Sequence, residues 1–169
     1  MALLKKMRGD GAAPPPRPPF RETAAVALVV VALIGGLTWL TMTLEVALLL
    51  GTFAASSLLV FGFPDAPFSQ PRSVLLGHLI GSACGLGAAH FLPFWWGPAV
   101  AVGAAVALMK VARAVHPPAC SNPLILCALP SASWTFLFFP TLTGAGLIVL
   151  GALCYHNLRR DARWPKYWF

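Results

Sequence analysis

Long apolar stretches alternate with short polar interruptions along this chain, and their spacing predicts helices that cross a membrane. The stretch 24–43 holds 20 residues without a charge, which is the helix length that the hydrocarbon core of a bilayer requires. Six such segments can be drawn: Ala24 to Thr43, Val46 to Phe63, Val74 to Phe91, Phe94 to Met109, Ser121 to Phe139 with a break at Pro130, and Thr141 to Tyr155. We therefore expect an all-α membrane protein whose transmembrane domain covers residues 23–157.

The positions of the basic residues predict the topology. All 12 Lys and Arg residues fall in four places: Lys5, Lys6, Arg8, Arg17 and Arg21; Arg72; Lys110 and Arg113; Arg159, Arg160, Arg163 and Lys166. Six crossings with the N-terminus inside put all four places in the cytoplasm, and Glu45 is the one charge in the other loops. An alternative with four spans, in which the second and fifth segments are re-entrant, would place Arg72 and Lys110 outside, so we prefer six.

We expect both ends of the chain to be cytoplasmic tails and the membrane to be a bacterial inner membrane. Residues 1–22 are basic and proline-rich and lack the apolar core of a signal peptide, so we expect a flexible tail. Residues 158–169 are basic and aromatic. Aromatic residues near segment ends are typical of interfacial belts: Trp95, Trp96, Trp164, Tyr167 and Trp168. We expect His90 and His156 to be interfacial as well.

Composition excludes several classes of function. Hydrophobic residues make up 58% of the chain and charged residues 10%, whereas a soluble domain has about 25% charged residues. The net charge of +7 comes from residues that flank apolar segments, so we expect no nucleic-acid partner. No pair of carboxylates lies inside a segment, and no nucleophilic triad or set of metal ligands is visible. We therefore expect no enzyme activity, no metal and no cofactor, and a lipid bilayer and a small solute as partners.

Two stretches of the chain resemble each other. Residues 54–64 read AASSLLVFGFP and residues 119–130 read ACSNPLILCALP. Each lies in the middle segment of a predicted three-helix half, and an odd number of spans inverts the second half relative to the first. The pattern predicts a 3+3 inverted pseudo-repeat with broken or short second and fifth segments, which is an arrangement common in transporters.

A glycine stripe marks the third segment. Gly77, Gly81 and Gly85 recur every four residues, and small residues at this spacing let helix backbones approach closely. We interpret the stripe as a packing surface; the alternative is that it lines a narrow pore.

The stretch 112–130, ARAVHPPACSNPLILCALP, interrupts apolar sequence with polar residues and prolines. Pro117 and Pro118 enforce an extended entry into a helix that would begin near Ser121, with Ser121 and Asn122 as capping residues. The positive end of that helix could bind an anion inside the protein, with His116 beside it. Ser56 and Ser57 offer the same device in the second segment. The alternative is an ordinary loop, with His116 among the lipid headgroups.

These motifs resemble the HPP family of small integral membrane proteins. The resemblance rests on the run His116-Pro117-Pro118-Ala119, on Gln70-Pro71-Arg72 and on Gly77-His78, and it covers residues 24–156. The family is thought to comprise transporters, and the resemblance implies nitrite as a substrate because plant and cyanobacterial members are linked to nitrite movement. The chain departs from the family pattern at Cys120-Ser121-Asn122-Pro123 and at Ala54-Ala55-Ser56, where a more polar lining would alter the substrate.

A second polar constellation precedes the third segment. Arg72 reads either as a topological anchor or as part of a cytoplasmic vestibule that concentrates anions together with Lys110. Gln70 could bind a passing solute or cap the turn. His78 lies deeper, where an ionisable group faces protein or water. It could be neutral and bonded to a carbonyl, or it could relay protons.

The hypothesis from sequence is a transporter or channel for a small inorganic anion, with nitrite first. Helix starts at Ser56/Ser57 and Ser121/Asn122 would supply the donors. A chain this small would enclose a path more easily as a homo-oligomer. Two alternatives remain open: a carrier or channel for a neutral solute or a cation, and a scaffold that recruits a partner without transporting.

Overall fold

The computed structural model describes residues 12–45, 48–159 and 163–169, and every regular element among them is helical. The longer helices are α2 (Phe20–Leu44), α3 (Gly51–Gly62), α4 (Pro71–Phe91), α5 (Gly97–Val111), α6 (Asn122–Ala128) and α7 (Thr143–Arg159). Four short helical turns join them: η1 (Pro67–Ser69), η2 (Pro117–Ser121), η3 (Trp134–Leu137) and η4 (Phe138–Leu142). The all-α membrane architecture predicted from the sequence is thus confirmed. The predicted start of the second segment, Val46, lies outside the described residues.

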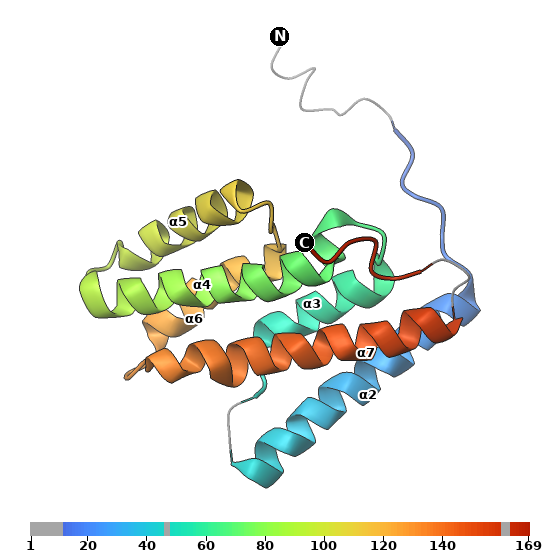
Figure 1. Cartoon of the computed structure of the whole chain (residues 1–169), viewed down its shortest axis with the longest axis horizontal. Coiled ribbons are helices and arrows are strands. Elements are labelled where there is room, and N and C mark those ends of the chain that lie inside the picture. Colours follow the sequence, from blue (N-terminus) through green and yellow to red (C-terminus); the bar gives the residue numbers. More distant parts are fainter. Residues whose placement is uncertain (1–11, 46–47, 160–162) are drawn as a thin grey trace.

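Successive helices run back and forth between the two ends of the molecule (Figure 1). By length and composition, α2, α4 and the continuous stretch Trp134–Arg159 could each cross a membrane, whereas α3 and α5 are shorter apolar helices. At 1.5 Å per residue, α4 measures about 31 Å and α3 about 18 Å. The short second and fifth segments expected from the sequence are therefore present as α3 and as η2 with α6.

The fifth predicted segment, Ser121 to Phe139, is wrong in its extent. Only the first part of this segment is helical as one piece: the turn η2 begins at Pro117, and α6 continues from it and ends at Ala128. Residues from Trp134 onward form η3 and η4, which lead into α7 and lengthen the last span. Apolar content alone could not show this division, because both pieces are equally hydrophobic and Pro130 marks only a break between them.

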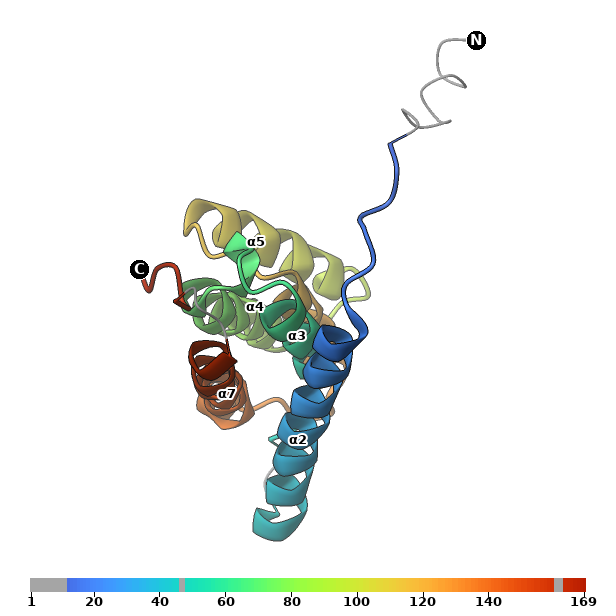
Figure 2. The same cartoon turned by 90° about the vertical axis from the view of Figure 1, so that its right-hand side faces the viewer.

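Helix α4 lies at the centre of the bundle, with α5 on one side and α7 on the other (Figure 2). Its glycine stripe faces η2 and α6. A Cβ atom built on Gly77 would lie 2.6 Å from Cβ of His116, and one on Gly85 would lie 2.7 Å from Cα of Pro123. A Cβ on Gly81 would collide with the carbonyl of Ala119. The packing interpretation of the stripe is confirmed, since each glycine admits the backbone of the neighbouring segment.

The main apolar core lies between α2, α3, α4 and α7. Phe53, Val60, Val74 and Ile148 are fully buried there. Phe53 packs directly against Gly144, where a Cβ would overlap its ring. On the other side of α4, a smaller cluster of Ala105, Met109 and Ala119 joins α5 to η2. Burial of these side chains stabilises the bundle and holds η2 against the glycine stripe of α4, while α3 packs against α2, α7 and η2.

The C-terminal residues return to the loop between α3 and α4. Trp164 is only 2% exposed, and its indole nitrogen donates to the carbonyl of Pro64 (3.2 Å). The ring lies 5.6 Å from that of His156, whose Nε2 contacts the carbonyl of Val60 (2.9 Å). The interfacial positions predicted for Trp164 and His156 are therefore wrong: both side chains find their polar partners in the protein core.

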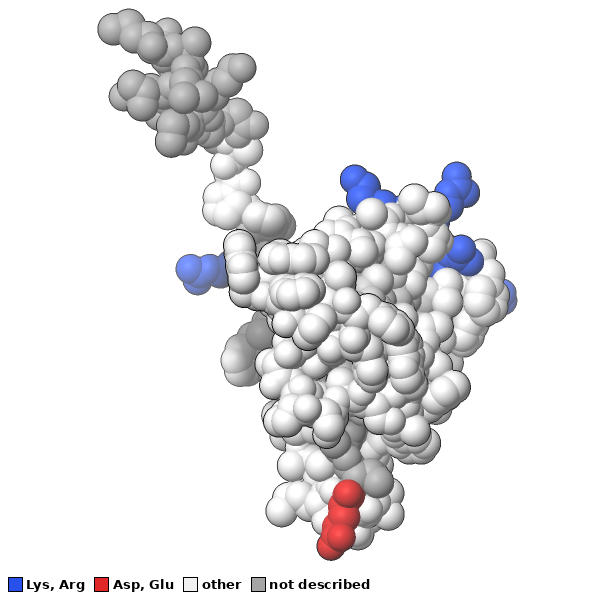
Figure 3. Space-filling view, turned by 90° about the vertical axis from the view of Figure 1, so that its left-hand side faces the viewer, with Lys and Arg blue, Asp and Glu red and all other residues white. Residues whose placement is uncertain are grey.

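The described basic residues gather at one end of the molecule. They lie on the approach to α2, the start of α4, the end of α5 with the turn after it, and the end of α7 with the tail. Lys5, Lys6, Arg8 and Arg160 lie outside the described residues. Figure 3 shows the opposite end, where uncharged surface dominates and basic side chains appear only at the margins. The bundle thus has one basic end and one nearly uncharged end.

Candidate functional site

A buried serine hydroxyl joins two histidines at the centre of the bundle. Ser56, on α3, lies with its Oγ 2.9 Å from Nε2 of His78 and 2.9 Å from Nε2 of His116. The two imidazole centroids are 5.0 Å apart. The Oγ atom is also 2.9 Å from the carbonyl of Thr52, one turn earlier in α3. All three side chains are fully buried, so this is a polar centre inside an apolar protein.

The polar centre continues in both directions as a chain of hydrogen bonds. At one end, Nδ1 of His116 donates to the carbonyl of Phe68 (2.7 Å), because a carbonyl can only accept. At the other end, the amide Nδ2 of Asn122 donates to Nδ1 of His78 (3.2 Å) and to Oγ of Ser82 (2.9 Å). Oγ of Ser82 lies 2.9 Å from Oγ1 of Thr141. We call this set the polar chain; its side chains are those of His116, Ser56, His78, Asn122, Ser82 and Thr141.

A tight turn after α5 places His116. Arg113 adopts a left-handed backbone (φ 53°), and the N–H of Ala114 returns to the carbonyl of Met109 (2.8 Å). This is the geometry with which helices commonly end and reverse. The chain then passes Gly77 so closely that no side chain fits there. His116 consequently points inward to Ser56 instead of outward to the headgroups, so the alternative of an ordinary headgroup-facing loop is wrong.

Of the two predicted helix starts, the one at Ser56 and Ser57 is wrong. Helix α3 begins at Gly51, which places Ser56 and Ser57 in its interior, where both hydroxyls lie within hydrogen-bonding distance of carbonyls one turn back. The predicted start near Ser121 is confirmed, because α6 begins at Asn122 with Ser121 as its N-cap residue, but no side-chain cap bond forms and the short turn η2 directly precedes it. Two prolines without N–H groups occupy the first turn of η2. What converges at the centre is a set of side chains, not two helix tips.

The structure separates the predicted binding residues into two groups. Ser56, His116 and Asn122 belong to the polar chain, as does His78 from the predicted pathway. Ser57 is buried, but its hydroxyl donates only to the carbonyl of Phe53 in its own helix (2.7 Å). Of the remaining three, Pro118 is buried, whereas Pro117 and Ser121 are exposed.

The three remaining pathway residues lie at the basic end. Gln70 is fully buried: its amide nitrogen donates to Pro64 (2.8 Å) and its oxygen accepts from the backbone N–H of Lys166 (2.8 Å). It therefore holds the loop before α4 together. Arg72 donates to the carbonyl of Ala112 (2.9 Å) and ties the start of α4 to the turn after α5. The side chain of Lys110 is exposed nearby on the last turn of α5.

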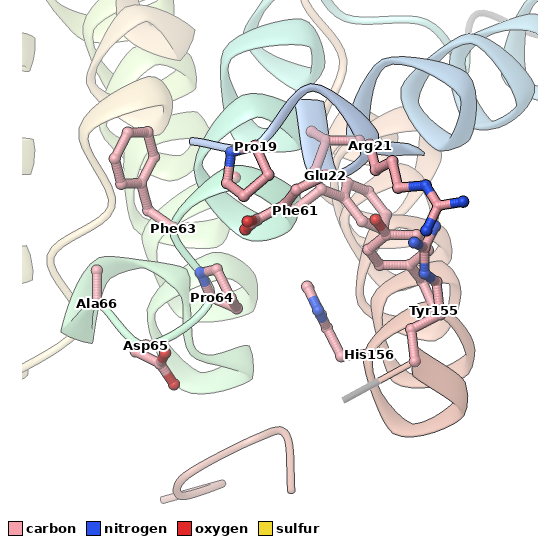
Figure 4. Close-up of a pocket in the computed structure, with 13 residues that line it drawn as sticks. Pro19, Arg21, Glu22, Phe61, Phe63, Pro64, Asp65, Ala66, Tyr155 and His156 are labelled. Atoms are coloured by element: carbon pink, nitrogen blue, oxygen red, sulfur yellow. The ribbon is translucent and has the colours of Figure 1, made fainter. Parts of the chain in front are cut away.

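A cavity of about 590 Å³ opens elsewhere, between the start of α2, the end of α3 and the end of α7. Figure 4 shows Arg21 of α2 beside Tyr155 of α7, with Asp65 on the loop after α3 across the space. None of the binding or pathway residues predicted from the sequence lines this cavity. We take the polar chain as the candidate site, because buried polar groups inside a membrane domain are costly and are usually retained for function.

Sequence reasoning missed two members of the polar chain. Ser82 lies four residues after His78, so both occupy one face of α4, and this spacing was a usable signal. Thr141 comes from η4, far along the chain, and nothing in its local sequence points to Ser82. Within the described part of the chain, no three His, Cys, Asp or Glu side chains come together as metal ligands.

An all-helical bundle with apolar spans and a buried polar chain defines an integral membrane protein. The family model for the HPP transmembrane region matches residues 15–165, and the chain belongs to the HPP family. Two transmembrane proteins of Dictyostelium discoideum are similar: one is 32% identical over 74% of this chain and 47% of its own length, the other 31% identical over 76% and 44%. The chain thus spans about half the length of these relatives. No solved structure matches it.

Proposed function

We propose that this protein moves a small inorganic anion across the membrane, with nitrite as the first candidate. The observation that carries the proposal is the polar chain, in which histidine, serine, asparagine and threonine side chains replace apolar packing at the centre of the bundle. Polar side chains in membrane domains mark solute paths by default. Membership of the HPP family supports the same reading.

The chemistry of the polar chain suits a small polar solute. Hydroxyl, imidazole and amide groups can replace the water around an anion without a buried lysine or arginine. Arg72, Lys110 and Arg113 surround the turn that delivers His116, and their positive potential raises the local anion concentration at the basic end. The proposed path therefore runs from this end to Ser56 and its two histidines.

The topology forms part of the proposal. We place the basic end, and with it both tails, on the cytoplasmic side, by the positive-inside rule. We assign the protein to a bacterial inner membrane. The two halves, with α3 in the first and η2 with α6 in the second, form the inverted pair, and a homo-oligomer completes the path.

The test is flux into liposomes that contain the purified protein. Nitrite, nitrate, formate and a neutral solute are offered separately, and the rate is compared with that of protein-free vesicles. Preference for the anions supports the proposal. Equal movement of the neutral solute would reject anion selectivity and favour the second candidate, a path for a solute that donates hydrogen bonds. That candidate has one supporting observation: Oδ1 of Asn122, which is 1% exposed, has no hydrogen-bond partner among the described residues.

Two neighbouring residues give a matched pair of variants. We expect Asn122→Ala to abolish anion flux, because it removes the amide that links His78 to Ser82. Ser121→Ala should leave flux unchanged, because its side chain is exposed. Initial rates in liposomes, normalised to reconstituted protein, make the measurement. Equal loss in both variants would remove the polar chain from the transport path.

A scaffold role without transport makes the opposite prediction. Removal of residues 1–19, before α2, should then abolish function in cells, while Asn122→Ala should have no effect. Under the transport proposal, the truncated protein keeps its liposome flux because no residue of the polar chain is removed.

A further inference from the structure

The polar chain has fewer hydrogen atoms available for bonding than it has short polar contacts. Five hydrogen-bonding distances surround Ser56 and the two histidines: three at Oγ of Ser56, one from His116 to Phe68 and one from His78 to Asn122. Each needs one hydrogen between its two atoms. Neutral His78, neutral His116, Ser56 and Asn122 each supply one to these contacts, which makes four. One contact lacks a hydrogen whichever tautomers are chosen.

A single added proton removes the mismatch. With His116 protonated, Nδ1 donates to Phe68 and Nε2 donates to Oγ of Ser56. His78 then donates from Nε2 to the same oxygen, whose two lone pairs accept both bonds. The hydroxyl of Ser56 donates to Thr52, and Nδ1 of His78 accepts from Asn122. Every contact now has its hydrogen, so the atoms are arranged for the singly protonated pair.

The proton nevertheless adds a charge that the surroundings do not balance. The groups that face the two rings are uncharged: Ser56 and Phe53 from α3, Asn122 from α6 and the Phe68 carbonyl from η1. Helices α3 and α6 carry no charged residue. The charged groups on the other packed elements turn elsewhere: Arg72 bonds Ala112, and Lys110, Arg113 and Arg159 are exposed. The titratable groups do so as well: His156 bonds Val60, Tyr155 packs on Phe61, Cys84 and Cys120 pack against the Met109 cluster, and His90 and Cys154 are exposed.

Burial therefore opposes protonation of the histidine pair unless an anion is bound beside it. His116 lies in the turn between α5 and η2, outside the helices that could cross the membrane, and burial lowers its pKa to about 4 even though the Phe68 carbonyl acts in the opposite direction. A buried cation becomes tolerable when an anion lies beside it. Anion and proton then stabilise each other in the site, and this coupling is reciprocal by thermodynamic necessity.

We propose that the His78–Ser56–His116 cluster is a proton-binding site that couples the entry of one monovalent anion to the uptake of one proton. The inference rests on the proposed function and specifies it as electroneutral cotransport. The proton comes from water on the side where the anion enters, is held on the imidazole pair, and leaves with the anion on the other side. No net charge crosses the membrane in one cycle.

The deciding experiment separates a pH gradient from a membrane potential. Liposomes with the wild-type protein receive nitrite under an inward proton gradient, or under a potassium diffusion potential without a pH gradient. Protein-free vesicles measure the background uptake, in which uncharged nitrous acid crosses the bilayer without protein. Nitrate is the control anion, because its acid is too strong to form in the buffers used for a proton gradient. We expect protein-dependent uptake to follow the pH gradient and to ignore the potential.

The outcomes distinguish the inference from the proposed function. Uptake that follows the potential and ignores the pH gradient overturns proton coupling and leaves anion transport standing. Absence of protein-dependent flux for every anion overturns both. For His116→Gln we expect gradient-driven uptake to fall to the protein-free level. His90→Gln is the matched control, since His90 is an exposed histidine at the far end of α4, and it should behave like the wild type.

A measurement on the wild-type protein keeps the test independent of variant folding. Nitrite is added to the detergent-purified protein in weakly buffered solution near neutral pH, and a pH indicator records proton uptake. We expect one proton to be taken up for each nitrite bound. Binding without proton uptake would overturn the inference.

Discussion

Gly81→Ala is expected to destabilise the bundle strongly. The new methyl group would collide with the backbone carbonyl of Ala119, which cannot move without displacing η2 and His116 with it. Overpacking of this kind costs typically 1–3 kcal/mol, and we expect about 3 kcal/mol because the obstacle is backbone and not a flexible side chain. The midpoint of thermal unfolding in detergent should fall by about 10 °C, the shift that such a loss gives in a chain of this size.

The same helix provides the control. A methyl group added at Gly87 would meet no atom within 4 Å, so Gly87→Ala should leave the unfolding midpoint unchanged or raise it slightly, because alanine favours helix over glycine. A stable Gly81→Ala protein with an unchanged midpoint would show that α4 and η2 are not in direct backbone contact at this position. The comparison is made on monodisperse protein in one detergent.

Ser56→Ala should abolish anion transport, whereas Ser57→Ala should retain it. Among the described residues, the Ser56 hydroxyl alone hydrogen-bonds both histidines, and its removal leaves two buried imidazole nitrogens without this partner. The cost to stability should be about 2 kcal/mol. Ser57 is equally buried but bonds only within α3, so its loss should cost less than about 0.6 kcal/mol.

The readouts for this pair are liposome flux and the thermal midpoint of both variants. A Ser56→Ala protein that folds with a modest loss of stability yet transports at the wild-type rate would contradict the role given to the serine. Loss of transport in both variants would indicate that the whole buried face of α3 matters, instead of the bond to the histidines.

Hydrophobic patterning predicted the helices well because the signal is strong for apolar segments of membrane length. The third segment was drawn as Val74 to Phe91, and α4 extends only three residues further at its start. The glycine spacing likewise predicted close packing without any structural information. For the fifth segment, the predicted break at Pro130 is confirmed, since α6 ends at Ala128, but the apolar residues after the break belong to the last span and not to the fifth.

The site was only partly predictable. Ser56 and Ser57 look equivalent in sequence, but adjacent residues point about 100° apart on a helix, so one can face a partner only if the other faces elsewhere. The same geometry separates Ser121 from Asn122. Local sequence identified the polar residues, whereas the bonds among them depend on how four distant segments meet around α4.

The idea of helix tips failed for a related reason. Helix α6 does begin beside Ser121, but η2 precedes it directly from Pro117, since proline is well accommodated in a first turn, so the start of α6 is not an open helix end. The contact between His116 and α4 depends on Gly77, whose lack of a side chain lets His116 approach the helix. A glycine reveals that something comes close, but not what it is.

The docking of the tail bears on how the protein is made. The carbonyls of Pro64 and Pro67 accept bonds from Gln70 and Ser73 close by, and also from Trp164 and Tyr167, 100 residues later. During synthesis the loop before α4 can therefore close first on its local donors. The aromatic contacts form only after residues 164–167 have left the ribosome, so a part of the fold that is made early is completed by a part that is made late.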